Sequence, residues 1–130
     1  MKRRFELEPG EAIVDEWVAG IPSSSGRTSQ YGGSLILTTS RLIWEAVRLP
    51  PGFDRLVGGM FLESMMDGIA LADVIGARAD EERGMILHID STEGETRLLV
   101  SASRWSPLWS KRNRVARDAA VARIRGAIGG

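Results

Sequence analysis

The sequence predicts a mainly β domain of the α+β class, in which about seven antiparallel strands form a barrel that one C-terminal α-helix closes. Through about residue 101, short apolar stretches with a period of two alternate with Gly, Pro and Ser turn residues. From about residue 111 the apolar period becomes that of a helix. A sheet that must bury one face can bend round on itself, so that a single amphipathic helix covers its open end.

Length and composition predict one domain spanning residues 1–130, with a core from about residue 8 to 128. The absence of cysteine excludes disulfides and thiolate chemistry, and it fits a reducing compartment such as the cytoplasm. The basic start of the chain is followed by acids, which is not the pattern of a secretory signal. No apolar run approaches the roughly 20 residues needed to cross a bilayer.

The first expected strand, residues 12–18, is rich in β-branched and aromatic residues and follows a Pro-Gly breaker pair. Its alternation is interrupted by the adjacent acids Asp15 and Glu16, which indicates a bulge. Residues 20–33 are rich in Gly and Ser and are expected to form a polar loop.

Residues 34–49 are predicted to form a hairpin. Residues 34–38 form a continuous apolar run, typical of a strand buried on both faces. The short hydroxyl residues Thr39 and Ser40 favour a tight turn. The second arm, residues 41–49, then places Leu42, Trp44 and Ala46 on one face.

Residues 67–75 are expected to form the next strand, with Ile69, Leu71 and Ile75 on one face and residues 77–79 continuing the sheet. Two further strands, residues 85–89 and 97–101, are separated by a turn in which Gly94 supplies positive φ. The only histidine, His88, faces away from Leu87 and Ile89 and is expected to be exposed.

The closing helix covers residues 111–128, where Ala and Arg dominate. One stripe of small and apolar residues is expected to face the sheet: Ala116, Ala120, Ile124 and Ala127. The helix is capped either by Ser106 ahead of Pro107 or by Asn113, and it ends at Gly129 and Gly130.

Three motifs occur in the order seen in one group of small β domains: Pro9-Gly10-Glu11, Leu35 to Trp44 (LILTTSRLIW) and Ile69 to Val74 (IALADV). With the basic closing helix, the chain resembles the GRAM and bacterial pleckstrin-homology-like (PH-like) families from about residue 8 to 128. The resemblance implies a seven-stranded barrel with a C-terminal helix. It also implies lipid-headgroup recognition, membrane recruitment or protein docking. The loop at residues 49–68 is longer than the family pattern implies.

That long loop is unusually apolar and holds three of the five methionines. An apolar loop packs on its own domain, contacts a second copy or a partner, or enters a lipid interface. The residues proposed for contact with a partner or membrane are Phe53, Leu56, Met60, Phe61, Met65 and Met66.

The formal net charge is zero, but the charge is unevenly distributed. Residues 1–102 carry 10 Lys/Arg and 16 Asp/Glu, whereas residues 103–130 carry 7 and 1. The basic segment either binds anionic partners or lies solvated beside the acidic body. The residues proposed for an anionic ligand are Arg27, Lys111, Arg114 and Arg125. Nucleic acid is not an expected partner, because the rest of the chain is acidic.

No residue pattern supports catalysis, a metal site or a cofactor. The sequence therefore favours a non-catalytic binding module that docks a protein or self-associates as a homo-oligomer. The alternative is a peripheral module at the inner face of the membrane that binds anionic lipids such as phosphoinositides.

Overall fold

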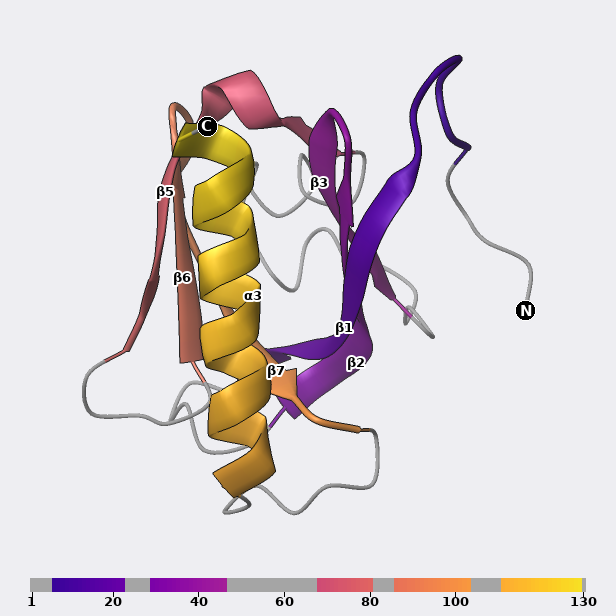
Figure 1. The fold of residues 1–130 in the computed structure, drawn as a ribbon. Helices are drawn as coiled ribbons and strands as arrows, with labels where there is room; N and C mark the ends of the chain where they lie inside the picture. Colours follow the sequence, from indigo (N-terminus) through magenta and orange to yellow (C-terminus); the bar gives the residue numbers. More distant parts are fainter. Residues whose placement is uncertain (1–5, 23–28, 47–67, 81–85, 104–110, 130) are drawn as a thin grey trace.

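The computed structural model describes residues 6–22, 29–46, 68–80, 86–103 and 111–129. These residues form one antiparallel sheet and a C-terminal helix, with a short 3-10 helix between two strands (Figure 1). The elements are β1 (Ile13–Pro22), β2 (Ser29–Thr38), β3 (Arg41–Ala46), β4 (Ile69–Ala70), η1 (Leu71–Asp73), β5 (Val74–Ala79), β6 (Ile86–Ser91), β7 (Gly94–Ser101) and α3 (Lys111–Gly129). No helix within these ranges has the length and apolar character needed to span a bilayer.

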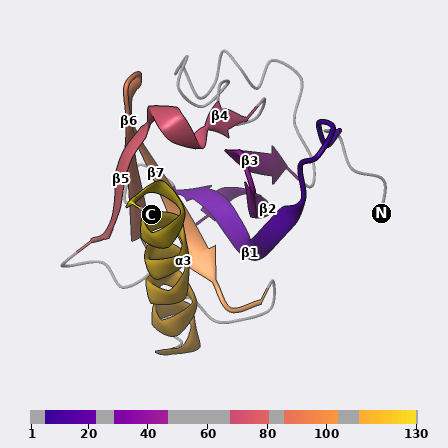
Figure 2. The same cartoon turned by 45° about the horizontal axis from the view of Figure 1, so that its top comes forward.

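The seven strands lie in the order β4-β3-β2-β1-β7-β6-β5, and the sheet does not close into a barrel. The prediction of a closed barrel is therefore wrong in that respect. The two edge strands, β4 and β5, follow each other along the chain, but they are joined by η1 instead of by a ladder of hydrogen bonds. Viewed from the top, the strands bend round and α3 lies along the open side (Figure 2).

The predicted central hairpin is confirmed. β2 and β3 pair from Gly33↔Ala46 to Leu37↔Leu42, around a turn at Thr39 and Ser40. Residues 35–38 are all buried, so this strand is covered on both faces as its continuous apolar run predicts. The predicted bulge in β1 is also present, as a register shift between Ile13 and Asp15.

Two expectations for the strands are corrected. β1 extends to Pro22 and β2 starts at Ser29, so much of the expected 20–33 loop lies in paired strands, where Gly20 lies opposite Gly32. The Gly and Ser residues read as loop signals, but pairing with neighbouring strands holds them extended.

The expected strand at residues 67–75 is divided by η1, and its face assignment is wrong for one residue. Ile75 is 69% exposed, whereas Val74 and Ala77 are buried on β5. η1 precedes β5, and a register shift between Val74 and Gly76 then interrupts the alternation, so Val74 and Ala77 face the core instead of Ile75.

Two of the three family-like motifs meet around Glu11, whose side chain is only 2% exposed. Its carboxylate accepts hydrogen bonds from the hydroxyls of Thr38 and Ser40. Arg41 donates to it from Nε at 2.9 Å and from Nη2 at 3.0 Å. Hydrogen bonds to Arg41, and then to the hydroxyls, hold the pKa of the Glu11 carboxyl well below its usual range, although burial opposes this. All of these donors come from the chain itself, so this cluster is a structural link between the N-terminal segment and the β2–β3 turn.

α3 packs on the sheet through the predicted apolar stripe, with one correction. Val121 and Ile124 join the main core, and Ala120 is fully buried, but Ala127 is exposed. At the start of the helix Asn113 is buried, and its Oδ1 accepts the N–H of Ala102 at 2.9 Å. Asn113 therefore connects the first turn of the helix to the chain that follows β7, instead of capping a shorter helix.

Candidate functional site

Several of the residues proposed from the sequence lie outside the described ranges. The six residues of the apolar loop fall within 47–67, and Arg27 falls within 23–28. The proposed role of that loop therefore remains a prediction.

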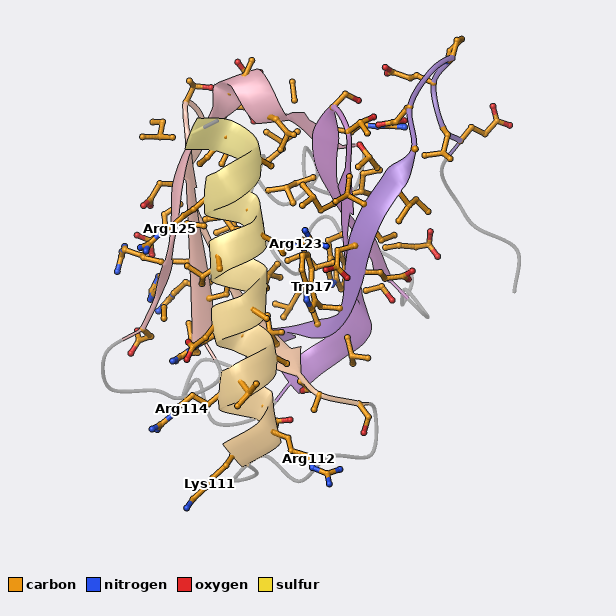
Figure 3. All side chains as sticks on the ribbon, in the orientation of Figure 1. Trp17, Lys111, Arg112, Arg114, Arg123 and Arg125 are labelled. Atoms are coloured by element: carbon orange, nitrogen blue, oxygen red, sulfur yellow. The ribbon has the colours of Figure 1, made fainter. Side chains whose placement is uncertain are left out.

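The three basic helix residues proposed for an anionic ligand are all exposed, but they are not brought together (Figure 3). Lys111 and Arg114 lie in the first turns of α3, whereas Arg125 lies near its other end, beside β5. Arg123 points to the opposite side, where its Nε lies 3.3 Å from Asp15 on β1. The basic residues of the helix thus lie in separate regions, and the one at Arg125 borders a groove.

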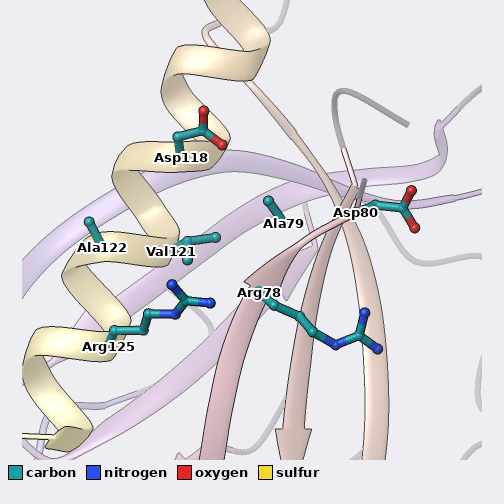
Figure 4. A pocket seen from close by; sticks show the side chains of 7 residues that line it. All are labelled: Arg78, Ala79, Asp80, Asp118, Val121, Ala122 and Arg125. Carbon is teal, nitrogen blue, oxygen red and sulfur yellow. The ribbon is translucent and has the colours of Figure 1, made fainter. Parts of the chain in front are cut away.

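A groove of about 680 Å³ runs between α3 and β5 (Figure 4). On the helix side, the lining has small apolar residues between two charged residues. On the strand side, it has one small apolar residue between two charged residues. Its lining consists of Arg78, Ala79, Asp80, Asp118, Val121, Ala122 and Arg125.

β5 presents an open strand edge to this groove, because among the described strands it pairs only with β6. The N–H of Asp80 donates to the carbonyl of Ile86 at 3.0 Å. In an antiparallel ladder, backbone groups alternate between the partner strand and the free edge. The backbone groups of Ala77 and Ala79 therefore point away from β6, and the Ala77 carbonyl accepts a 2.7 Å hydrogen bond from Arg125 Nε.

The charges of the groove are sorted by sign along its length. Asp80 and Asp118 lie toward one end, whereas Arg78 and Arg125 lie toward the other (Figure 4). Arg78 is engaged in ion pairs with Glu95 at 3.0 Å and with Asp90 at 3.7 Å. Arg125 forms no ion pair with any carboxylate in the described part of the chain, so its charge is not neutralised there.

His88 adjoins the acidic end of the groove, and the prediction that it is exposed is wrong. The residue is 6% exposed, with Nε2 at 2.8 Å from Asp80 Oδ2 and Nδ1 at 2.9 Å from Glu95 Oε1. Alternation places His88 on the face opposite Leu87, as expected, but that face is also buried.

Arg117 is a second buried polar residue that the sequence pattern did not reveal. It is 6% exposed, and its Nη1 donates to the Asp80 carbonyl at 3.2 Å. Its Nε and Nη2 both donate to Asp118 Oδ1. One signal was available, because Arg117 follows the buried Asn113 by four residues and so lies on the same helix face. Arg117 therefore connects the end of β5 to the helix, beside the groove.

The acid cluster around His88 predicts a pH-dependent effect of one substitution. The hydrogen bond from His88 lowers the pKa of Glu95, its burial opposes this, and Arg78 adds to the lowering. A lowered pKa means that the contribution to stability is present above the ordinary value of 4.5 and is lost as the pH falls below it. We expect Glu95→Gln to lower the urea concentration at the midpoint of unfolding at pH 7, but to change it little at pH 3.

The control for this experiment is Asp73→Asn, at an exposed acid of η1. Its midpoint should follow the wild type at both pH values. An equal loss at pH 7 and pH 3 in Glu95→Gln would show that the carboxylate charge of Glu95 does not contribute.

The described residues of the groove offer several kinds of contact to a ligand. Within the described ranges, no three His, Asp or Glu residues are grouped so that they could hold a metal ion. The groove offers backbone groups, three small apolar side chains and charges of both signs. No protein-family model and no curated protein matches the chain.

Proposed function

We propose that this chain is a non-catalytic binding domain of the PH-like kind, which docks an extended segment of a protein partner along the free edge of β5. The observation that carries the proposal is the groove between β5 and α3, into which the strand edge opens. Its volume of about 680 Å³ lies in the range of protein ligand sites, which is roughly 300 to 1,000 Å³.

Strand addition uses the groups that β5 leaves unpaired. An extended segment that joins a sheet edge gains main-chain hydrogen bonds, and pockets for its alternate side chains supply specificity. The N–H groups of Ala77 and Ala79 and the C=O of Ala79 provide the first, and the lining of α3 provides the second. Ala79 and Ala122 have short side chains, which leaves room for the backbone of an added segment.

The PH-like part of the proposal is supported by the order of elements. Seven antiparallel strands precede one C-terminal helix, and the helix packs on the sheet through a single apolar stripe. Two of the three motifs, at residues 9–11 and 35–44, meet in the Glu11 cluster. The open sheet differs from the closed barrel that the resemblance implies.

The non-catalytic part is supported by the environment of His88. Both ring nitrogens lie within hydrogen-bond distance of carboxylates, so neither is available as a general base for a substrate. The residues around it connect β5, β6 and β7, which is a structural task.

Peptide selection on the intact chain tests the docking proposal. Random peptides displayed on phage would be selected for binding, then synthesised and titrated against the wild type and two variants. Ala122→Trp fills the groove and should weaken the selected peptides at least tenfold. Ala127→Trp, at an exposed position turned away from the groove, should change the affinity less than twofold. Equal affinity for Ala122→Trp and the wild type would overturn docking at this groove.

The membrane alternative has one observation in its favour: Lys111, Arg112 and Arg114 lie near the same end of the molecule (Figure 3). Each basic residue near an anionic membrane contributes about 1 kcal/mol. Flotation with vesicles of phosphatidylcholine, with and without phosphatidylserine, tests this alternative. Salt-sensitive flotation that Lys111→Glu/Arg114→Glu abolishes, together with an empty peptide selection, would replace the docking proposal.

A further inference from the structure

We infer that the docked segment carries a basic residue followed, two to four positions later, by an acidic residue. This inference rests on the proposed function, because it specifies the partner of the same groove. It derives from the direction of α3, from the hydrogen-bonding atoms that its charged side chains retain for a ligand, and from the spacing between those side chains.

α3 runs antiparallel to β5 along the groove. Arg117, early in the helix, donates to the carbonyl of Asp80, and Arg125, two turns later, donates to the carbonyl of Ala77. Asp118 therefore lies at the Asp80 end of the groove, and Arg125 lies at the Ala77 end, as Figure 4 shows.

Each of these two helix residues retains capacity for a ligand. Asp118 receives both bonds from Arg117 on Oδ1 and its side chain is 56% exposed, which leaves Oδ2 as an acceptor for a ligand. Arg125 uses Nε for the Ala77 carbonyl, which leaves its terminal nitrogens for a carboxylate. Asp118 is therefore complementary to a Lys or Arg side chain of the ligand, and Arg125 is complementary to an Asp or Glu side chain.

Spacing converts this pattern into a sequence rule. Asp118 and Arg125 are seven residues apart, which is about 10 Å along a helix at about 1.5 Å per residue. An extended segment covers that distance in about three residues at about 3.3 Å each. Side chains of an extended segment alternate between two faces, so two charges on the same face lie two or four positions apart. At a spacing of three positions they lie on opposite faces, and longer side chains are then needed for both to reach the helix.

Strand direction then fixes the order. Every described pair in this sheet is antiparallel, and antiparallel pairing is slightly the more stable form. A segment added antiparallel to β5 runs from the Asp80 end toward the Ala77 end. Its basic residue, next to Asp118, therefore precedes its acidic residue, next to Arg125.

Three synthetic peptides that differ only in their charges test this rule by fluorescence anisotropy. They are Ac-Thr-Lys-Val-Thr-Val-Glu-Thr-NH2, the same peptide with Lys and Glu exchanged, and the same peptide with Lys at both positions. We expect the wild type to bind the Lys-then-Glu peptide at least tenfold more tightly than either of the others.

A charge reversal in the protein should change the preference in a defined way. In Arg125→Glu both ends of the groove are acidic, so the peptide with two lysines should become the tightest ligand. Lys111→Glu changes the net charge equally but lies outside the groove, about four helical turns from Arg125, so it should keep the order of the wild type. Circular dichroism establishes that both variants are folded.

The outcomes separate this inference from the proposed function. If peptides selected by display bind at the groove but the three charged peptides bind equally, or none binds, the charge rule is wrong and docking stands. The rule is also wrong if Arg125→Glu keeps the order of the wild type. If no peptide of any kind is affected by Ala122→Trp, the groove is not a docking site and both proposals fail.

Discussion

Replacement of Glu11 by Gln is expected to lower the free energy of unfolding by about 3 kcal/mol at pH 7, because a nearly buried ion pair loses one partner. The Arg41 side chain is only 14% exposed and bonds to both carboxylate oxygens of Glu11. The amide of Gln carries no charge, and its nitrogen cannot accept a hydrogen bond. The hydroxyls of Thr38 and Ser40 converge on the same carboxylate, so they also lose their acceptor if the amide nitrogen takes the place of Oε2.

This loss should depend on pH. The pKa of Glu11 lies below its ordinary value of 4.5, so its contribution is fully present above that value and declines as the pH falls toward the folded-state pKa. Urea unfolding at pH 7 and pH 3 measures the difference, with Glu8→Gln at an exposed neighbouring acid as the control. A Glu11→Gln variant as stable as Glu8→Gln at pH 7 would show that the cluster does not stabilise the fold.

Truncation of Ile124 to Ala is expected to cost about 3 kcal/mol, the second large effect. The side chain is fully buried, and it packs with Val121 into the core, to which all seven strands contribute. Removing its methyl groups leaves a cavity at the interface between helix and sheet, which neighbouring side chains fill only in part.

The matched control is Val115→Ala on the same helix, at a position that is 69% exposed. It should change the free energy of unfolding by less than about 0.5 kcal/mol, and Ala is itself a good helix former. Chemical unfolding followed by tryptophan fluorescence measures both variants. If Ile124→Ala and Val115→Ala lower the free energy of unfolding by the same small amount, the helix does not seal the core.

The central hairpin and the closing helix could be predicted because local signals and burial agree there. The apolar run at residues 35–37 matches a strand covered on both faces, and the hydroxyl of Thr38 accepts the N–H groups of Ser40 and Arg41 at the turn that follows. The helix stripe at Ala120 and Ile124 follows the helical period into the core. In these segments propensity, pattern and tertiary packing favour the same structure.

The open sheet could not be predicted, because closure depends on pairing between distant segments. β4 is only two residues long, and the chain enters η1 at Leu71 instead of continuing as a strand. A 3-10 turn of three residues has no strong sequence signal, and the alternating apolar residues at 69–75 are equally compatible with a strand.

The groove shows how far the candidate site could be predicted. Arg125 was proposed as an anion-binding residue from charge alone, and the structure places it at a strand edge. His88 and Arg117 were missed because their partners, Asp80, Glu95 and the Asp80 carbonyl, come from other elements. Strand alternation reveals which face a residue occupies, but not whether that face is covered.

The most direct test of the account is amide hydrogen exchange at Ala77 and Ala79, measured by NMR with and without the Lys-then-Glu peptide. Strand addition would give the outward N–H groups of β5 acceptors in the peptide backbone. The account predicts that exchange at both amides slows at least tenfold on binding, while the already paired Asp80 amide changes little. Unchanged exchange at Ala77 and Ala79 in a saturated complex would contradict docking along this edge.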